Sequence, residues 1–131
     1  MHFLGVIRKV ISKYLDLFAG AGGLSEGFVR AGYSPVAHVE MDTAACYTLK
    51  TRMAYHWLKS NHNLTPYHQY LCGEISRDEF YSMIPERILD SILNVEISSE
   101  TLPRIFHKID LLLEGEKLDL IVGGPPCQAY S

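Results

Sequence analysis

A glycine-rich segment directly after a short apolar run constrains the fold of this chain more than any other feature. The segment, residues 19–23 with the sequence AGAGG, follows residues 13–18, whose sequence KYLDLF suits a strand. Glycine has no Cβ, so the backbone can turn tightly there and approach a ligand closely. Beyond the turn, Leu24, Phe28 and Val29 recur at helical spacing until Gly32, a residue type that ends helices. The segment therefore predicts a strand, a glycine turn and a helix whose N-terminal amides face a ligand.

The rest of the chain continues this alternation of strands and helices. Further strands are predicted at residues 35–39, 95–97 and 118–122, and amphipathic helices at residues 43–59 and 102–113. The run at 118–122 is apolar without alternation, which is typical of a strand buried on both faces. This order favours right-handed crossovers, a parallel sheet and an α/β fold. Residues 1–12 fit a strand or a helix equally well.

Residues 61–94 interrupt the alternation. Two short helices are predicted within them, the first opened by a capping box formed by Ser76 and Glu79 and the second beginning at Pro85. The segment is too short for a domain of its own. We interpret it as an insertion. Its aromatic residues could stack on nucleic acid, but packing against the helices of the sheet is favoured.

The composition excludes several classes of protein. A length of 131 residues suits one domain, and a net charge of −3 gives no overall basic field that would draw the chain to nucleic acid. No apolar run approaches the roughly 20 residues of a membrane span. Three widely spaced cysteines fit a reducing, cytoplasmic setting, with Cys46 and Cys72 as small packed residues. Neither the cysteines nor the six histidines have the spacing of a metal site.

An acidic residue at the end of the second strand extends the glycine turn into a candidate nucleoside site. Glu40 lies twenty residues after Gly20, the spacing at which a carboxylate reaches ribose hydroxyls. Met41 follows it and could lie against an adenine face through its polarisable thioether. The alternative is a tight turn beside a surface glutamate. A dinucleotide fingerprint would have a third glycine where this chain has Ser25, which weakens the reading as a nicotinamide-dependent oxidoreductase.

A thiol after two prolines follows the last strand. Pro125 and Pro126 restrict the backbone before Cys127, and a strand end exposes it, which suits a nucleophile. The side-chain amide of Gln128 could hold a polar edge of a substrate. A lone cysteine is more often a small buried residue, but this context favours catalysis.

Three segments in this order resemble motifs of the C5-cytosine methyltransferases: residues 16–24 (DLFAGAGGL), 39–42 (VEMD) and 124–131 (GPPCQAYS). The resemblance implies a Rossmann-like fold and S-adenosyl-L-methionine as the cofactor. The glycine turn would cradle its methionine part, Glu40 would hold its ribose and Met41 would pack on its adenine. Glu96 is our choice for the adenine amino group, ahead of Asp110. The residues assigned to the cofactor are Phe18, Ala19, Gly20, Ala21, Gly22, Gly23, Leu24, Glu40, Met41, Glu96, Ile97 and Pro126.

The resemblance also implies a reaction. Cys127 would attack C6 of a flipped-out cytosine in double-stranded DNA, as in restriction-modification enzymes, with Gln128 and Ser131 near the nucleic acid. Two alternatives stay open: a tRNA cytosine C5 methyltransferase, and the cofactor-binding half of a split or truncated enzyme.

Members of the family continue beyond this cysteine with a ring-protonating glutamate, a target-recognition region and a closing helix. We therefore expect residues 1–131 to be the N-terminal part of the catalytic domain, inactive alone. In such a part the far edge of the last strand, residues 118–122, would lie unpaired and would favour self-association.

Overall fold

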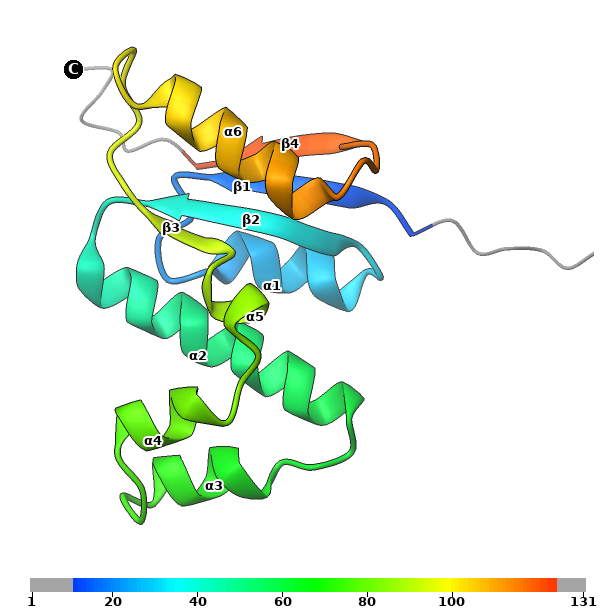
Figure 1. Ribbon diagram of the computed structural model, residues 1–131. Coiled ribbons are helices and arrows are strands. Elements are labelled where there is room, and N and C mark those ends of the chain that lie inside the picture. Colours follow the sequence, from blue (N-terminus) through cyan, green and yellow to red (C-terminus); the bar gives the residue numbers. More distant parts are fainter. Residues whose placement is uncertain (1–10, 125–131) are drawn as a thin grey trace, which may run out of the picture.

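A computed structural model describes residues 11–124 and shows a four-stranded parallel sheet with the strand order β3-β2-β1-β4 (Figure 1). The strands are β1 (Lys13–Leu17), β2 (Ser34–Glu40), β3 (Ile92–Asn94) and β4 (Leu120–Gly123). The helices are α1 (Gly23–Arg30), α2 (Thr43–Ser60), α3 (Thr65–Leu71), α4 (Arg77–Ser82), α5 (Glu86–Leu89) and α6 (Leu102–Leu113). The predicted α/β fold, a parallel sheet with flanking helices, is confirmed.

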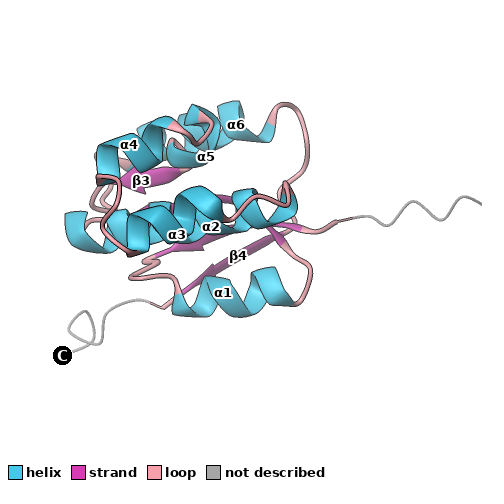
Figure 2. Cartoon of the chain, turned by 90° about the horizontal axis from the view of Figure 1, so that it is seen from below, coloured by secondary structure: helices cyan, strands magenta, loops and turns pink. Residues whose placement is uncertain are grey.

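Helices cover both faces of the sheet. Figure 1 shows α6 on one face and α1 and α2 on the other, with α3 and α4 outside α2. Figure 2, a view from below, shows α1 and α2 side by side across their face. No helix within residues 11–124 is long and apolar enough to cross a membrane.

The core between α6 and the sheet explains the amphipathic pattern of residues 102–113. Ile105, Ile109 and Leu113 recur at steps of four residues, and their buried side chains pack on Leu15 of β1 and Val39 of β2. Burying a side chain of this size stabilises a fold by about 1.5–3 kcal/mol. This contact fixes the crossover from β3 to β4.

The other face is packed by α2. Asp42 caps this helix as its side chain accepts hydrogen bonds from the backbone N–H groups of Ala44 and Ala45, each at 3.3 Å. Leu49 and Met53 are buried beneath the sheet together with Cys46, which confirms Cys46 as a packed residue. Cys72 is exposed, so its predicted burial is wrong; it follows a short surface helix instead of facing the sheet.

Helix α1 ends where the glycine pattern predicted. Gly32 has a φ of +92°, its N–H donates to the carbonyl of Val29, and the N–H of Tyr33 donates to the carbonyl of Phe28, both at 3.0 Å. A left-handed residue that turns the chain back in this way is favoured by glycine.

The third strand lies earlier than the sequence suggested. The structure has β3 at Ile92–Asn94, so the prediction of a strand at residues 95–97 is wrong. Asn94 pairs with Glu40, the last residue of β2, and residues 95–97 therefore extend beyond the last available partner. The strand also takes the last three residues of the range assigned to the insertion.

Residues 61–91 form three short helices, one more than predicted, because α3 precedes the two expected ones. The capping box is confirmed: the Ser76 hydroxyl accepts from the N–H of Glu79 at 3.1 Å. Pro85 caps α5 at the predicted start. Phe80 is fully buried against Ala54 and Leu58 of α2, and the ring of Tyr70 stacks on it at 4.9 Å. The aromatic residues of this segment thus form a small core of their own.

The last strand is more exposed than predicted. β4 begins at Leu120, two residues later than expected, and pairs only with β1 among the described strands. The expected burial on both faces is wrong, since Ile121 is 56% exposed. The apolar sequence of residues 118–122 is typical of a strand in the middle of a sheet. Within residues 11–124, however, β4 lies at the edge of the sheet.

Candidate functional site

The carboxyl ends of the parallel strands surround a cavity of about 440 Å³. In open α/β sheets this edge is where ligands bind. Six residues predicted from the sequence line the cavity: Phe18, Gly20, Glu40, Met41, Glu96 and Ile97. The structure therefore brings together side chains from the glycine turn, the end of β2 and the segment after β3.

The glycine turn has an unusual backbone. Phe18, Gly20 and Gly22 have φ values of +55°, +56° and +90°. A positive φ is common for glycine but strained for phenylalanine, and such strain concentrates at functional sites. The N–H of Ala19 donates to the carbonyl of Val39 at 3.0 Å, which anchors the turn to β2. Phe18 is left 38% exposed at the cavity.

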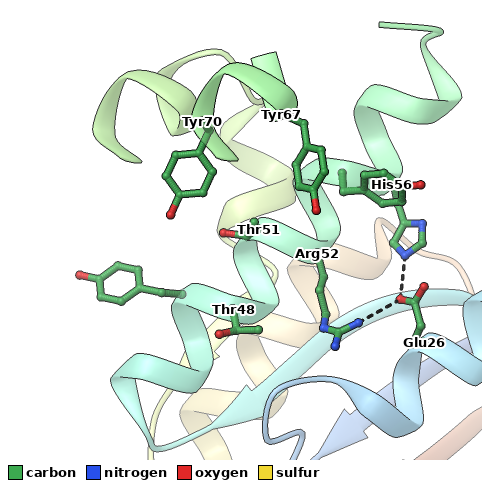
Figure 3. A pocket seen from close by; sticks show the side chains of 9 residues that line it. Glu26, Thr48, Thr51, Arg52, His56, Tyr67 and Tyr70 are labelled. Atoms are coloured by element: carbon green, nitrogen blue, oxygen red, sulfur yellow. Dashed lines mark hydrogen bonds and ion pairs between the residues drawn. The ribbon is translucent and has the colours of Figure 1, made fainter. Parts of the chain in front are cut away.

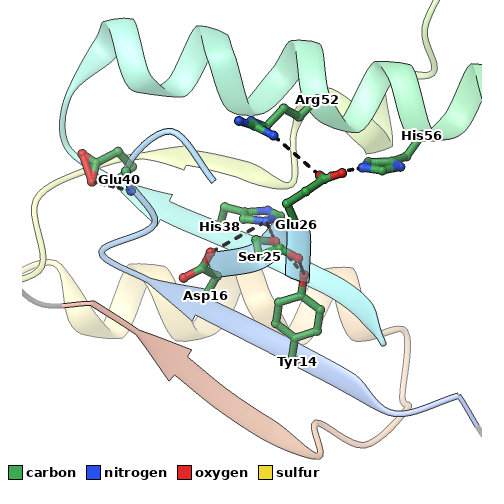
Figure 4. Close-up of polar contacts among 9 residues, drawn as sticks. Tyr14, Asp16, Ser25, Glu26, His38, Glu40, Arg52 and His56 are labelled. Carbon is green, nitrogen blue, oxygen red and sulfur yellow. Dashed lines mark hydrogen bonds and ion pairs between the residues drawn. The ribbon is translucent and has the colours of Figure 1, made fainter. Parts of the chain in front are cut away.

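The carboxylate of Glu40 is held from two sides. Its Oε1 accepts from the N–H of Gly20 at 3.2 Å, and its Oε2 accepts from the N–H of Asp42 at 3.1 Å. The thiol of Cys46 donates to the carbonyl of Glu40 at 3.3 Å from below. The glycine turn and the end of β2 are thus joined through one side chain, at the left of Figure 4.

The opposite wall of the cavity comes from residues 95–97. Glu96 has an exposed side chain, while its backbone carbonyl accepts from the hydroxyl of Thr101 at 2.5 Å. Ile97 is half-buried, and Met41 is 66% exposed across from it. The cavity therefore combines apolar walls with two carboxylates, Glu40 and Glu96.

Other predicted cofactor residues lie in the turn or at the start of α1 but do not line this cavity: Ala19, Ala21, Gly22, Gly23 and Leu24. Gly22 faces α2 instead, where an added Cβ would lie 2.9 Å from Cδ2 of Leu49 and 3.2 Å from Cδ of Arg52. Gly22 therefore permits close packing of the turn on α2. Asp110 is exposed on α6 and is not part of the cavity.

Four predicted residues lie outside the part of the chain that the structure describes: Pro126, Cys127, Gln128 and Ser131. Their roles stay predictions. Gly124, the last described residue, lines the cavity, so the chain leaves β4 at the cavity.

A buried polar network below the turn was not anticipated from the sequence. The Ser25 hydroxyl lies 2.6 Å from the hydroxyl of Tyr14 and 2.6 Å from Nε2 of His38. That same Nε2 lies 4.0 Å from Oδ2 of Asp16 (Figure 4). All four residues are at most 1% exposed. The available signal was a polar residue in the middle of each apolar strand, Asp16 in KYLDL and His38 in SPVAHVE.

Three atoms of this network lack a hydrogen-bond partner within residues 11–124: both carboxylate oxygens of Asp16 and Nδ1 of His38. Burial, and then the charge of Glu40, raise the pKa of Asp16 to about 6. Burial lowers the pKa of His38 to about 4. Burial thus disfavours the charged form of each residue. At neutral pH, which is above both pKa values, Asp16 is still ionised and lies beside a neutral imidazole.

A second cavity of about 500 Å³ lies away from the strand ends, between α1, α2 and α3 (Figure 3). Glu26 accepts from Nε2 of His56 at 2.9 Å and pairs with Arg52 at 3.7 Å. The pKa of Glu26 is lowered, first by the His56 hydrogen bond. Tyr67 and Tyr70 line the other side. The charged side chains here neutralise one another and tie α1 to α2.

The known proteins that this chain resembles are DNA methyltransferases. The family described as C-5 cytosine-specific DNA methylase matches residues 12–69. The type II methyltransferase M.Bpa9945I of Bacillus paralicheniformis is 38% identical, over 89% of this chain and 31% of that protein. The type II methyltransferase M.AquIA of Picosynechococcus is 30% identical, over 91% of this chain and 34% of that protein. DNA (cytosine-5)-methyltransferase 3 of Arabidopsis thaliana is 32% identical, over 89% of this chain and 8% of that protein.

The chain spans about a third of the length of the curated relatives named first, 31% in one case and 34% in another. No solved structure matches the chain.

Proposed function

We propose, on the premise that this chain is a relative of the C-5 cytosine-specific DNA methylases, that its strand-end cavity binds S-adenosyl-L-methionine for methylation of cytosine C5 in DNA. The match to that family includes the glycine turn, β2 and all of α2. When bound, the cofactor supplies an activated methyl group.

The observation that carries the proposal is the position of Glu40. Its two oxygens accept N–H groups from Gly20 and Asp42, so the carboxylate is fixed at the edge of the cavity. Each carboxylate oxygen can accept more than one hydrogen bond, which leaves lone pairs for the two hydroxyls of a ribose. The Met41 thioether beside it suits an adenine face, and Glu96 suits the adenine amino group.

The residues present fit this cofactor better than a dinucleotide. In the dinucleotide fingerprint the third glycine allows close packing of helix on strand. Ser25 occupies that place here, and its hydroxyl is buried between Tyr14 and His38. Hydrogen bonds of the Ser25 side chain thus join helix α1 to the sheet, at the position where the dinucleotide fingerprint has a glycine without a side chain.

In the proposed reaction Cys127 is the nucleophile. Its thiolate adds to C6 of the cytosine, C5 then takes the methyl group, and loss of the C5 proton with elimination of the thiol restores the ring. Gln128 and Ser131 would lie near the base or its strand. A base stacked in a duplex would have to be flipped out first.

Two narrower questions follow from the same premise. The polymer could be tRNA instead of DNA, since the cavity argument concerns the cofactor alone. The chain could also act as a cofactor-binding half with a partner chain, or associate with itself through the exposed Leu120 and Ile121 at the edge of β4.

Calorimetric titration of the chain with S-adenosylhomocysteine and with NAD tests the cofactor. We expect saturable binding of the first with one site and no binding of the second. Binding of NAD alone, or of neither, would contradict the proposal. Incubation of the chain with labelled S-adenosyl-L-methionine and either DNA or tRNA tests its activity. We expect no methyl transfer by this chain alone; transfer that is lost in Cys127→Ala would contradict the expected inactivity and would identify the polymer.

A further inference from the structure

Asp16 lies on β1 directly before the glycine turn of the proposed cofactor site, and no described group neutralises its charge. Both of its oxygens are fully buried and lack a hydrogen-bond partner among the residues that the structure describes. More than nine in ten buried polar groups in proteins have a partner, so two orphan oxygens on one carboxylate call for an explanation. Asp16 precedes the glycine turn by two residues, and Phe18 and Gly20 of that turn line the cavity.

The surroundings of Asp16 leave its negative charge unscreened. His38 lies beside it, with 4.0 Å between Nε2 and Oδ2, but burial keeps the pKa of that imidazole at about 4 and so leaves it neutral above that pH. Ser25 and Tyr14 use their hydroxyls on each other and on His38. An unpaired charge in a buried site acts over a longer range than one in water.

Glu40 connects Asp16 to the cavity, because Glu40 lines the cavity and its charge repels that of Asp16. After burial, repulsion from Glu40 is the second cause of the raised pKa of Asp16. The influence is mutual, because a Coulombic interaction acts equally on both charges. A positive charge on a ligand beside Glu40 would therefore be stabilised by an ionised Asp16.

We propose that Asp16 is a specificity-determining residue of this site. Its buried, unpartnered carboxylate makes the cavity prefer a cationic sulfonium ligand to the neutral thioether that remains after methyl transfer. A proton on Asp16 removes that preference. The inference rests on the proposed function, since it concerns how the same cavity distinguishes the methyl donor from the spent product.

The sign of the pH dependence follows from the ligand charge. In the free chain Asp16 is protonated below about pH 6 and ionised above it. A cationic ligand favours the ionised form and so releases the proton on binding. Preference for the sulfonium should therefore rise with pH through this range. His38 and Tyr14 titrate outside it, since the pKa of His38 is lowered to about 4 and that of Tyr14 is raised above its usual 10.

The test compares two ligands that differ only in the methyl group and its positive charge. The full chain is titrated calorimetrically with S-adenosyl-L-methionine and with S-adenosylhomocysteine between about pH 5 and about pH 7.5. We expect the ratio of their affinities to shift toward the sulfonium as the pH rises, by about tenfold. Effects of pH on the groups that the two ligands share cancel in this ratio.

Asp16→Asn mimics the protonated side chain and should hold the ratio at its low-pH value throughout. The matched control is Asp110→Asn, the same change at an exposed site on α6, which should keep the wild-type profile. A ratio that does not change with pH in the wild-type chain overturns the inference, and so does a pH dependence that survives in Asp16→Asn. If that variant does not fold, the wild-type series alone decides.

These results separate the inference from the proposed function. If both ligands bind but the ratio of their affinities does not change with pH, the proposed role of Asp16 is wrong and the proposed cofactor site still stands. Failure of both ligands to bind at any pH would remove the site, and the inference with it.

Discussion

The backbone N–H of Gly20 donates to Oε1 of Glu40 at 3.2 Å, which joins the glycine turn to the end of the neighbouring strand. The two residues are twenty positions apart in the chain. Because β1 and β2 are parallel neighbours, their carboxyl ends meet at one edge of the sheet. A single carboxylate therefore shapes the turn and lines the cavity beside it.

Replacing Glu40 should weaken cofactor binding. Glu40→Gln keeps the size of the side chain but removes the charge and turns one acceptor into a donor facing an N–H group. Hydrogen bonds to charged groups contribute about 1.5–3 kcal/mol, so affinity for S-adenosylhomocysteine should fall by about tenfold or more. Calorimetry measures it, with Glu100→Gln, an exposed site outside the cavity, as the control. Equal affinities in both variants would contradict the assigned role.

Gly22→Ala should destabilise the chain. The position has a φ of +90°, and the new Cβ would lie 2.9 Å from Cδ2 of Leu49. Strain and overpacking together cost about 2–4 kcal/mol. The matched control is Gly27→Ala in the middle of α1, where nothing lies within 4 Å of the added Cβ. That substitution should stabilise the helix by about 0.5–1 kcal/mol. Urea unfolding of both variants checks the opposite signs.

Phe80→Ala should disrupt the small helical core of residues 61–91. Phe80 is fully buried against α2, and removing such a ring costs about 3–5 kcal/mol. The stacked Tyr70 would lose its partner. Met83→Ala, at a side chain 45% exposed on the same segment, should change the free energy of unfolding by less than about 1 kcal/mol. A similar loss in the two variants would contradict this packing.

Asp16 and His38 should have opposing effects on stability between about pH 4 and about pH 6. The folded chain holds a proton on Asp16, whose pKa is raised from 3.8 to about 6, so this residue makes the fold less stable as the pH rises. The pKa of His38 is lowered from 6.5 to about 4, so this residue makes the fold less stable as the pH falls. In the wild-type chain these two opposite changes of stability with pH nearly cancel.

Removing the Asp16 carboxylate should leave only the pH dependence of stability that comes from His38. In Asp16→Asn the free energy of unfolding should rise with pH across this window, relative to the wild-type chain, by on the order of 1 kcal/mol per pH unit. Urea unfolding at several pH values measures the difference. Parallel profiles for the variant and the wild-type chain would sink the argument. Asp110→Asn serves as the control, since its carboxylate is exposed.

The edge of β4 should promote self-association. Ile121 is 56% exposed on a strand that has no second partner among the described residues. Ile121→Lys places a charge on this edge, which natural proteins use to prevent edge-to-edge pairing. Light scattering should show a concentration-dependent mass for the wild-type chain and a monomer for the variant. A monomer in both at high concentration would argue against the predicted contact.

Much of the fold follows from local patterns in the sequence. Residues 13–18 and the glycines after them specify a strand and a turn, because an apolar β-rich run and residues without a Cβ each restrict the backbone locally. The spacing of Glu40 from Gly20 placed both at one edge of a parallel sheet, and the structure brings them into contact. Helix ends at Gly32 and Ser76 were readable for the same local reason.

Other features depended on neighbours that a linear pattern does not show. Residues 95–97 have the composition of a strand, yet β3 lies at Ile92–Asn94 because only those residues have β2 beside them. The exposure of Ile121 reflects the place of β4 in the sheet order and not its apolar sequence.

The sequence by itself determined the α/β order, the glycine turn and the acid that faces it, because these depend on backbone sterics and on regular spacing. Only the tertiary structure decided which glycine packs on α2 and how Asp16, Ser25 and His38 meet. Those contacts join β1, α1 and β2 across as many as 22 positions of the chain. Burial and charge then act on the assembled group, which is why the ionisation of Asp16 could be read from the fold and not from the pattern around the turn.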